Sequence, residues 1–263
     1  MCGVFGYHSL KSNNKKSKQI IERLFVLSEA RGKEASGVAA IFNDKIKVIK
    51  CPDTATNLIN SDVFQKEIYG DFQDEKTLSL IGHSRLVTNG YEDDQRNNQP
   101  VCKNDLVVIH NGILVNHQEV WKSENLGFKE SDLDSELIPT LATKYVNLGF
   151  SLQEALTEVY KHIKGMASIC VLPSSGEEFN LLTNNGSLYY VVNDSSTEFI
   201  FASERYILSK IIDELNLSGF SVENIKNLYA GSILNLNLHT LTLKVGVFGT
   251  LFDKTFTAKK KEI

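Results

Sequence analysis

Short apolar segments that suit buried strands occur in adjacent pairs along this chain of 263 residues, and segments with helical spacing gather between the pairs. Ile20, Ile21, Leu24 and Leu27, for example, repeat at the spacing of one helix face. An alternating βαβ fold would instead place a helix after each strand. The pattern therefore favours an α+β protein whose antiparallel sheets are covered by helices. The strand-like segments are 3–7, 38–41, 45–49, 78–82, 106–110, 167–172, 179–183, 188–192, 199–202, 232–238 and 240–247, and the helix-like segments are about 18–30, 134–148, 152–163 and 204–214.

The composition narrows the possible functions. Lys+Arg 28 against Asp+Glu 32 give a formal charge of −4, which argues against a nucleic-acid-binding protein. No apolar run approaches the ~20 residues that span a bilayer, and no basic and then apolar segment opens the chain, so we expect neither a membrane span nor a secretory signal. The four cysteines are widely spaced and form no CxxC pair, which argues against a zinc site or a disulfide scaffold. We expect a cytoplasmic protein without metal or cofactor.

Cys2 is the first candidate catalytic residue. Its small side chain favours removal of Met1, which would leave Cys2 with a free α-amine of ordinary pKa ~7.7–8.0. Such an amine can take the thiol proton, directly or through one water, without a histidine. Taken alone, a cysteine at this position is more often a small apolar residue of a first strand.

Two further segments combine arginine with glycine. In segment 30–37 the glycines permit a sharp turn with positive φ, although an ordinary helix end would look the same. Segment 82–90 places Arg85 at the end of an apolar strand, where a guanidinium can hold a carboxylate by two parallel hydrogen bonds. Thr88 and Asn89 can add hydrogen bonds there. The alternative is a surface arginine in a hairpin.

Segments 110–117 and 131–136 carry amides and carboxylates. Asn111 and Gly112 directly follow the strand-like run 106–109, and a side-chain amide with an unshielded backbone N–H is what a tetrahedral oxyanion requires. A plain Asn-Gly turn is the commoner meaning of this pair. In the acidic segment, Ser131 or Asp132 suits a helix N-cap, whereas a carboxylate near a helix start could instead bind a ligand ammonium.

Together these segments resemble the glutaminase domain of class II, or N-terminal nucleophile, glutamine amidotransferases. In wording they are most similar to the glutaminase half of glucosamine-6-phosphate synthase. The resemblance runs from Cys2 to about Leu238, and the family motifs occur in the family's order. These motifs lie at 2–6, 31–37, 84–90, 110–117 and 134–136. The pair Val4-Phe5 is also found in the purine-pathway amidotransferases, whereas Asn116-His117 favours the hexosamine branch.

The resemblance implies a reaction. Cys2 would attack the carboxamide of L-glutamine with its own α-amine as base and form a thioester, which water then hydrolyses to L-glutamate. Asn111 and Gly112 would form the oxyanion hole.

The resemblance also implies how glutamine would be held. Arg85 would bind the α-carboxylate with help from Thr88, and Asp134 would bind the α-ammonium. Asn89 stands where the family has histidine and can still donate a hydrogen bond. Arg31 would hold the loop beside the nucleophile.

The resemblance implies a four-layer αββα sandwich of the N-terminal nucleophile hydrolase type. We expect a glutaminase domain over residues 1–250 and a polar tail over 251–263. Leu86 replaces a family tryptophan that covers the site. The hexosamine synthases continue into a sugar isomerase domain without counterpart here. We therefore expect the ammonia acceptor, a synthase or sugar isomerase-like enzyme of amino-sugar biosynthesis, to be a separate polypeptide that docks near Leu86 and Tyr91.

Two other functions stay open at this point. The chain could be an N-terminal nucleophile amidohydrolase acting on a different amide, although such a substrate has no use for both Arg85 and Asp134. It could also be a non-catalytic regulatory subunit with the same fold, although Cys2 would then have no purpose.

Overall fold

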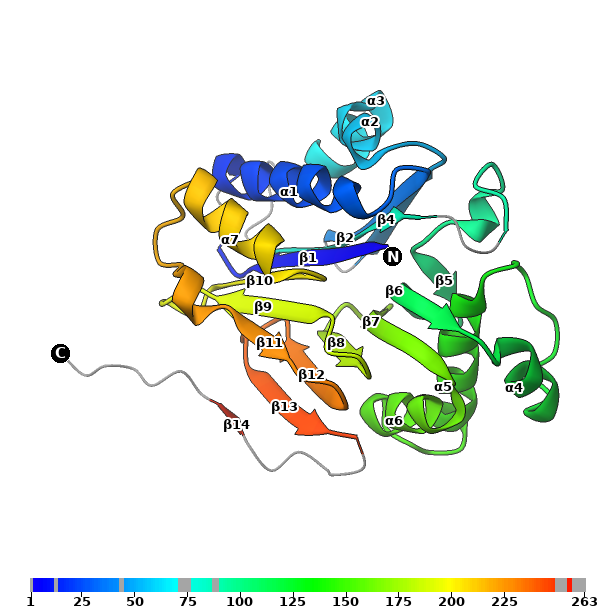
Figure 1. Cartoon of the computed structure of the whole chain (residues 1–263). Coiled ribbons are helices and arrows are strands. Elements are labelled where there is room, and N and C mark those ends of the chain that lie inside the picture. Colours follow the sequence, from blue (N-terminus) through cyan, green and yellow to red (C-terminus); the bar gives the residue numbers. More distant parts are fainter. Residues whose placement is uncertain are drawn as a thin grey trace.

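The computed structural model describes residues 2–11, 14–42, 45–70, 77–86 and 90–248, and the backbone of the short strand β14 at 255–256. Two seven-stranded sheets lie face to face, and helices cover the outer face of each (Figure 1). Every strand pair in both sheets is antiparallel. The predicted α+β fold with four layers, αββα, is confirmed.

The first sheet has the strand order β11-β9-β10-β1-β4-β2-β3. Its strands are β1 (Gly3–Ser9), β2 (Ala35–Phe42), β3 (Lys45–Cys51), β4 (Leu78–Arg85), β9 (Leu188–Val192), β10 (Glu198–Ala202) and β11 (Lys226–Leu228). The second sheet has the order β14-β13-β12-β8-β7-β6-β5. Its strands are β5 (Val101–Lys103), β6 (Leu106–Leu114), β7 (Gly165–Pro173), β8 (Glu178–Thr183), β12 (Ser232–Asn237), β13 (Leu243–Val247) and β14 (Thr255–Phe256).

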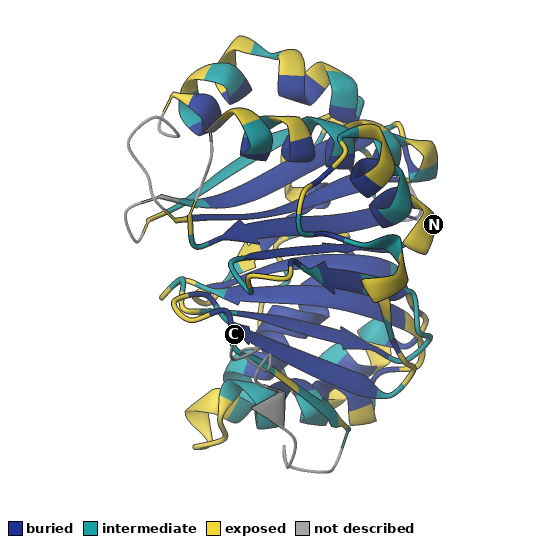
Figure 2. Ribbon diagram, turned by 90° about the vertical axis from the view of Figure 1, so that its left-hand side faces the viewer, coloured by how far each residue is buried: buried dark blue, intermediate teal, exposed yellow. Residues whose placement is uncertain are grey.

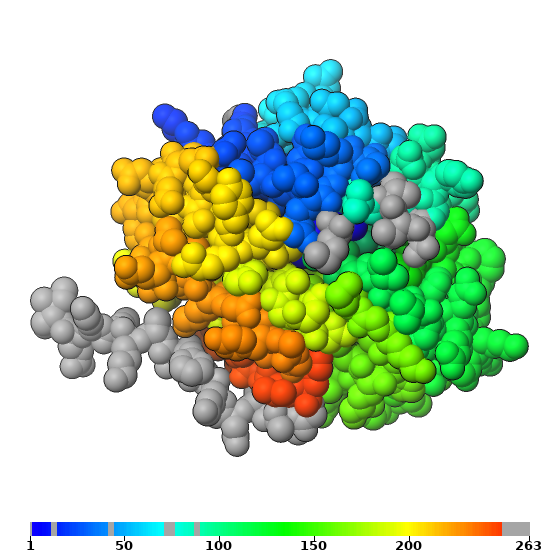
Figure 3. All heavy atoms as spheres, in the orientation of Figure 1, coloured from blue at the N-terminus to red at the C-terminus, as the bar shows by residue number. Residues whose placement is uncertain are grey.

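The helices form the two outer layers. Helices α1, α2 and α7 pack on the first sheet, and α5 and α6 pack on the second. Figure 3 shows α1 and α7, which are far apart in the sequence, side by side on one face. The helices are α1 (Asn14–Ser28), α2 (Ala55–Asn60), α3 (Asp62–Phe64), α4 (His117–Ser123), α5 (Leu137–Asn147), α6 (Leu152–His162) and α7 (Arg205–Glu214). No helix within the described ranges is both long and apolar enough to cross a membrane.

Three apolar layers hold the sandwich together, and they explain why the central strands are buried on both faces (Figure 2). Along β1, Phe5 and Tyr7 face α1 and α7, whereas Val4 faces the second sheet. The strands therefore read as continuous apolar runs, and period-2 alternation is weak. Burying this much apolar surface is the main term that stabilises the fold.

Three sequence expectations need correction. Strand β6 continues to Leu114 because it pairs with β7 along its whole length, so Asn111 and Gly112 lie inside a strand and form no turn. The helix predicted from Asp134 begins as a 3₁₀ turn at Asp134–Glu136, and α5 follows at Leu137. Neither Ser131 nor Asp132 caps it, since the residue at the N-cap is Leu133 and no side chain caps the turn. The Ser131 hydroxyl donates instead to the Glu136 carboxylate. Strands β5, β11 and β14 and helices α2 to α4 were not predicted.

Candidate active site

Strand register brings Cys2 next to Arg85. Gly3 pairs with Ser84 in the antiparallel β1–β4 ladder, so the residue before Gly3 lies beside the residue after Ser84. By strand alternation Cys2 faces the same side of β1 as Val4, which packs between the two sheets. Only 8% of Cys2 is exposed. The nucleophile candidate therefore lies at one end of the space between the sheets.

The backbone around Cys2 is held closely. The Arg31 Nε donates to the Cys2 carbonyl oxygen at 2.9 Å, and the same guanidinium is ion-paired with Glu204 at the start of α7. A Cβ on Gly32 would lie 2.2 Å from the Arg85 carbonyl carbon, so only glycine permits this approach. The expected positive φ is wrong for Gly32, whose φ of −177° is extended. Glycine is needed there for close packing of two backbone segments.

Burial raises the pKa of the Cys2 thiol, although the Leu86 carbonyl and the nearby Arg85 charge oppose this effect. The Cys2 Sγ lies 3.6 Å from the Leu86 carbonyl oxygen, to which the thiol donates. A thiol with a raised pKa stays protonated at neutral pH. A base must therefore remove its proton during any attack.

Arg85 is 3% exposed and ends β4, so the alternative of a surface arginine is excluded. Its Nη1 donates to the Asn98 Oδ1 at 2.8 Å and its Nη2 to the Gly90 carbonyl at 3.1 Å. Asn98 in turn donates to the Glu92 carbonyl at 2.6 Å, which fixes the loop that leads to β5. Sequence reasoning missed Asn98, because nothing nearby in the sequence points from it to Arg85. Thr88 and Asn89 lie outside the described residues.

Asn111 has a buried side-chain amide for which the described residues supply no hydrogen-bond partner, at either its nitrogen or its oxygen. The residue is fully buried on β6 opposite Ser168 of β7. By strand alternation Asn111 points the same way as Ile109, into the space that also receives Val4. A buried amide without a partner is uncommon in proteins and calls for an explanation.

Gly112 has a φ of +152°, a conformation that residues with side chains rarely adopt. A Cβ there would lie 1.8 Å from the Met166 carbonyl oxygen. Glycine is therefore required on both counts, which is a stronger restriction than the turn expected from the sequence.

Asp134 is held at the other side of the site. Its Oδ2 accepts from the Leu114 backbone N–H at 2.7 Å, and its Oδ1 accepts from the Ser135 hydroxyl at 3.3 Å. Ser135 also contacts the His110 Nδ1 at 2.9 Å, and Gln99 bonds both backbone groups of His110. Sequence reasoning did not identify this network. Its only sequence signal was the run of polar residues 97–99 that precedes Pro100.

The charges of Arg85 and Asp134 both act on the Cys2 thiol, so the three groups share one neighbourhood. The structure thus brings together five of the sequence-predicted residues, and Arg31 contacts the Cys2 backbone from outside. A thiol, a guanidinium, a carboxylate and an unpaired amide can attack and hold a small amino acid amide. Within the described ranges, no group of three His, Cys, Asp or Glu side chains is arranged to hold a metal ion.

Comparison with known proteins agrees with this geometry. Residues 83–210 match the family model described as a glutamine amidotransferase domain. This chain contains a glutamine amidotransferase domain. Its homologues are amidotransferase enzymes. The matched segment includes Arg85, Asn111 and Asp134.

Curated relatives match a larger part of the chain than the family model does, and a solved structure shares its fold. The glutamine–fructose-6-phosphate aminotransferase (isomerizing) of Sulfolobus acidocaldarius is 31% identical over 173 residues, which are 64% of this chain and 28% of the relative. The enzyme of the same name from Bartonella henselae is 26% identical over 219 residues, 82% of this chain and 34% of the relative. The chain thus spans about a third of these relatives. The glutamine phosphoribosylpyrophosphate amidotransferase of B. subtilis aligns with a TM-score of 0.68 at 22% identity, over 95% of this chain and 50% of that one. This last likeness concerns the fold.

Proposed function

We propose that this glutamine amidotransferase domain hydrolyses L-glutamine to L-glutamate and ammonia through a thioester on Cys2. The observation that carries the proposal is the buried Asn111 amide, which has no hydrogen-bond partner among the described residues and lies across the inter-sheet space from β1, the strand that follows Cys2. Fixed donors of this kind stabilise an oxyanion because they need no reorganisation during the reaction. The Gly112 N–H would be the second donor.

Because the buried Cys2 thiol is protonated, the mechanism must account for where its proton goes. Once Met1 is removed, the α-amine of Cys2 would take the thiol proton as sulfur attacks the carboxamide carbon. The carbonyl oxygen becomes an oxyanion at Asn111 and Gly112. The amine then returns the proton to the leaving nitrogen, ammonia departs, and water hydrolyses the thioester to release glutamate and the free thiol. Arg85 and Asp134 would hold the α-carboxylate and the α-ammonium during these steps, helped by Thr88 and Asn89.

A glutamine analogue with an electrophilic carbon in place of the carboxamide tests this chemistry. We expect one label per chain on Cys2 by intact mass and peptide mapping, in protein that lacks Met1, together with glutamate release from glutamine. The Cys2→Ala variant is the matched control and should take no label. Active protein that retains Met1 would contradict the mechanism, because an acylated amine is not a base.

We propose further that the ammonia passes to an acceptor enzyme of amino-sugar biosynthesis in the cytoplasm. The names of the curated relatives support this acceptor class. Leu86 is 38% exposed and Tyr91 is 81% exposed, next to the site, and such apolar side chains suit a docking surface for a separate polypeptide. A glutaminase assay with and without a candidate sugar isomerase, combined with size exclusion, tests this step. If the two proteins form no complex and the isomerase does not raise the glutaminase rate, this step is contradicted.

A further inference from the structure

Glu136 is a buried carboxylate whose oxygens are fully engaged. Its Oε1 is ion-paired with Lys103 and accepts from the Glu130 backbone N–H at 2.9 Å. Its Oε2 accepts from the Ser131 backbone N–H at 2.8 Å and from the Ser131 hydroxyl at 2.7 Å. Burial alone would raise the pKa of Glu136, but these hydrogen bonds outweigh it and lower the pKa. Glu136 is therefore an anion at neutral pH, although its side chain is only 2% exposed.

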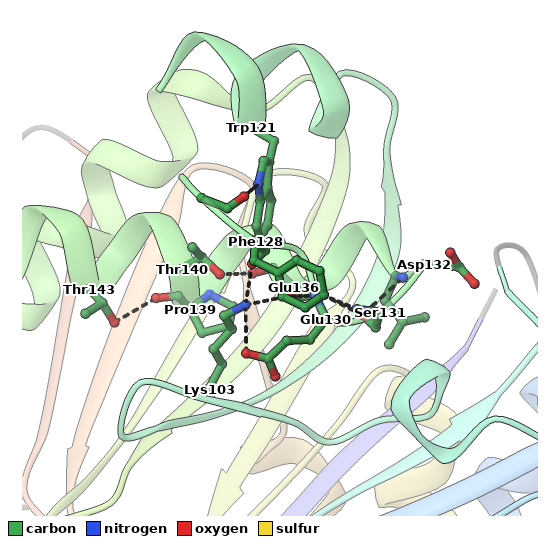
Figure 4. Close-up of polar contacts among 12 residues, drawn as sticks. Lys103, Trp121, Phe128, Glu130, Ser131, Asp132, Glu136, Pro139, Thr140 and Thr143 are labelled. Carbon is green, nitrogen blue, oxygen red and sulfur yellow. Dashed lines mark hydrogen bonds and ion pairs between the residues drawn. The ribbon is translucent and has the colours of Figure 1, made fainter. Parts of the chain in front are cut away.

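Lys103 joins this carboxylate to three other segments, as Figure 4 shows. It comes from the edge strand β5, and its Nζ lies 5.4 Å from the centre of the Trp121 ring on α4. The same Nζ donates to the Phe128 carbonyl at 3.3 Å and lies 3.2 Å from the Glu130 carboxylate. One ammonium thus ties together β5, α4, the loop 128–131 and the turn that carries Glu136.

The same 3₁₀ turn carries Asp134, two residues before Glu136. Asp134 is bonded to the end of β6 at Leu114, while Glu136 is bonded to β5 and to the loop 128–131. The Thr140 hydroxyl fixes the turn from α5 by donating to the Glu136 carbonyl at 2.7 Å. A three-residue turn fastened on opposite sides has little freedom to rotate. Displacing Glu136 would therefore move the Asp134 carboxylate.

The two carboxylates of this turn differ in their charged partners. Glu136 is neutralised by Lys103, whereas Asp134 forms no ion pair with any residue in the described ranges. Of these two neighbouring carboxylates, only Asp134 is left to attract a cation.

We propose that the Lys103–Glu136 ion pair, covered by Trp121, is a positioning device that sets Asp134 at the place of the substrate α-ammonium. This inference rests on the proposed glutaminase function and adds to it the residues that determine selectivity for a free amino acid. Lys103 and Glu136 touch no reacting atom and act through Asp134.

The test compares three full-length variants: Glu136→Gln, Lys103→Met and the double variant. Each single change breaks the ion pair, and we expect KM for glutamine to rise about tenfold, the loss of one hydrogen bond to a charged group, while kcat falls less than about threefold. The rate of Cys2 alkylation by iodoacetamide, which has no ammonium, should stay within about twofold of wild type, since the thiol is unchanged. The double variant should recover part of the loss of Lys103→Met, because it no longer buries an unpaired carboxylate.

Lys161→Met is the matched control, because it breaks the exposed Lys161–Glu158 pair and should leave KM unchanged. Thermal unfolding shows whether each variant is folded, and if Glu136→Gln is not, Lys103→Met and the double variant decide. Folded variants with wild-type KM would overturn the positioning role alone. An equal fall of alkylation and kcat would also overturn it, since that indicates general damage to the site. A wild-type chain that neither binds nor hydrolyses glutamine would overturn the proposed function and this inference with it.

Discussion

The space between the two sheets has an apolar centre and a polar end, built from the same strands. In the centre, Ile81, Ile109 and Phe201 belong to one buried apolar cluster. Two and four residues further along β4, the same face presents His83 and Arg85, and two residues along β6 it presents Asn111. These polar side chains at the end cost stability, since His83 and Asn111 are buried without partners among the described residues. The fold depends on the centre, and the end is free to serve chemistry.

Within the polar end, the functional groups differ in how firmly hydrogen bonds hold them. Arg85 and Asp134 are held by hydrogen bonds, so their positions are set before any ligand arrives. Asn111 is positioned by its strand, and its amide has no hydrogen-bond partner in the part of the chain that the structure describes. The held groups suit ground-state binding of the amino acid, whereas the unpaired amide suits a charge that exists only in the transition state.

Cys2→Ala should cause the largest loss of activity among the variants of the polar end. Without a nucleophile, glutamate release should fall by a factor on the order of 10⁴ or more. Calorimetry should show that glutamine still binds, because Arg85 and Asp134 remain, and the free energy of unfolding should change little. Hydrolysis at the wild-type rate would remove Cys2 from the mechanism.

Asn111→Ala should lower kcat by roughly 10²–10³-fold, the usual loss for one oxyanion donor. The free energy of unfolding should change by less than about 1 kcal/mol, because the amide has no partner to lose. Steady-state kinetics and chemical denaturation measure the two effects separately. A change confined to KM would mean that Asn111 binds substrate and does not stabilise the oxyanion.

Phe201→Ala should have the opposite pattern, a large loss of stability with little change in kcat. Phe201 is fully buried in the apolar centre, so its truncation should lower the free energy of unfolding by about 3–5 kcal/mol. At a temperature where the variant is still folded, kcat should stay close to wild type. If kcat fell as far as in Asn111→Ala, the two regions would not be separable.

His83 gives a smaller effect that depends on pH. Burial lowers the pKa of His83 to about 3, so the folded protein keeps this ring neutral while the unfolded chain binds a proton below its ordinary pKa. Stability from the neutral ring is therefore present above ~6.5 and is lost as the pH falls from there toward ~3, by about 1.4 kcal/mol per pH unit. His83→Asn should remove this part of the slope, which denaturant unfolding at neutral and mildly acid pH would show. Equal slopes in the two proteins would contradict the assignment.

Much of the secondary structure could be read from the sequence because apolar spacing reflects burial directly. The strand that follows Cys2, the strand that ends at Arg85, and the helices α1, α6 and α7 were predicted within a few residues. The start of strand β6 was also predicted, but its end was not, because Asn-Gly is a turn signal in isolation and pairing with β7 as far as Leu114 overrides it.

By itself the sequence predicted which chemical groups form the candidate site, since four of its five short motifs contain Cys2, Arg85, Asn111, Gly112 and Asp134. Only the tertiary structure decided how those groups are held. Asn98 lies 13 residues from Arg85 and Lys103 lies 33 residues from Glu136, and each pair meets only because loops and strands pack together. Local propensity is a property of neighbours in the chain, whereas the position of a buried charge depends on partners that the chain brings from a distance.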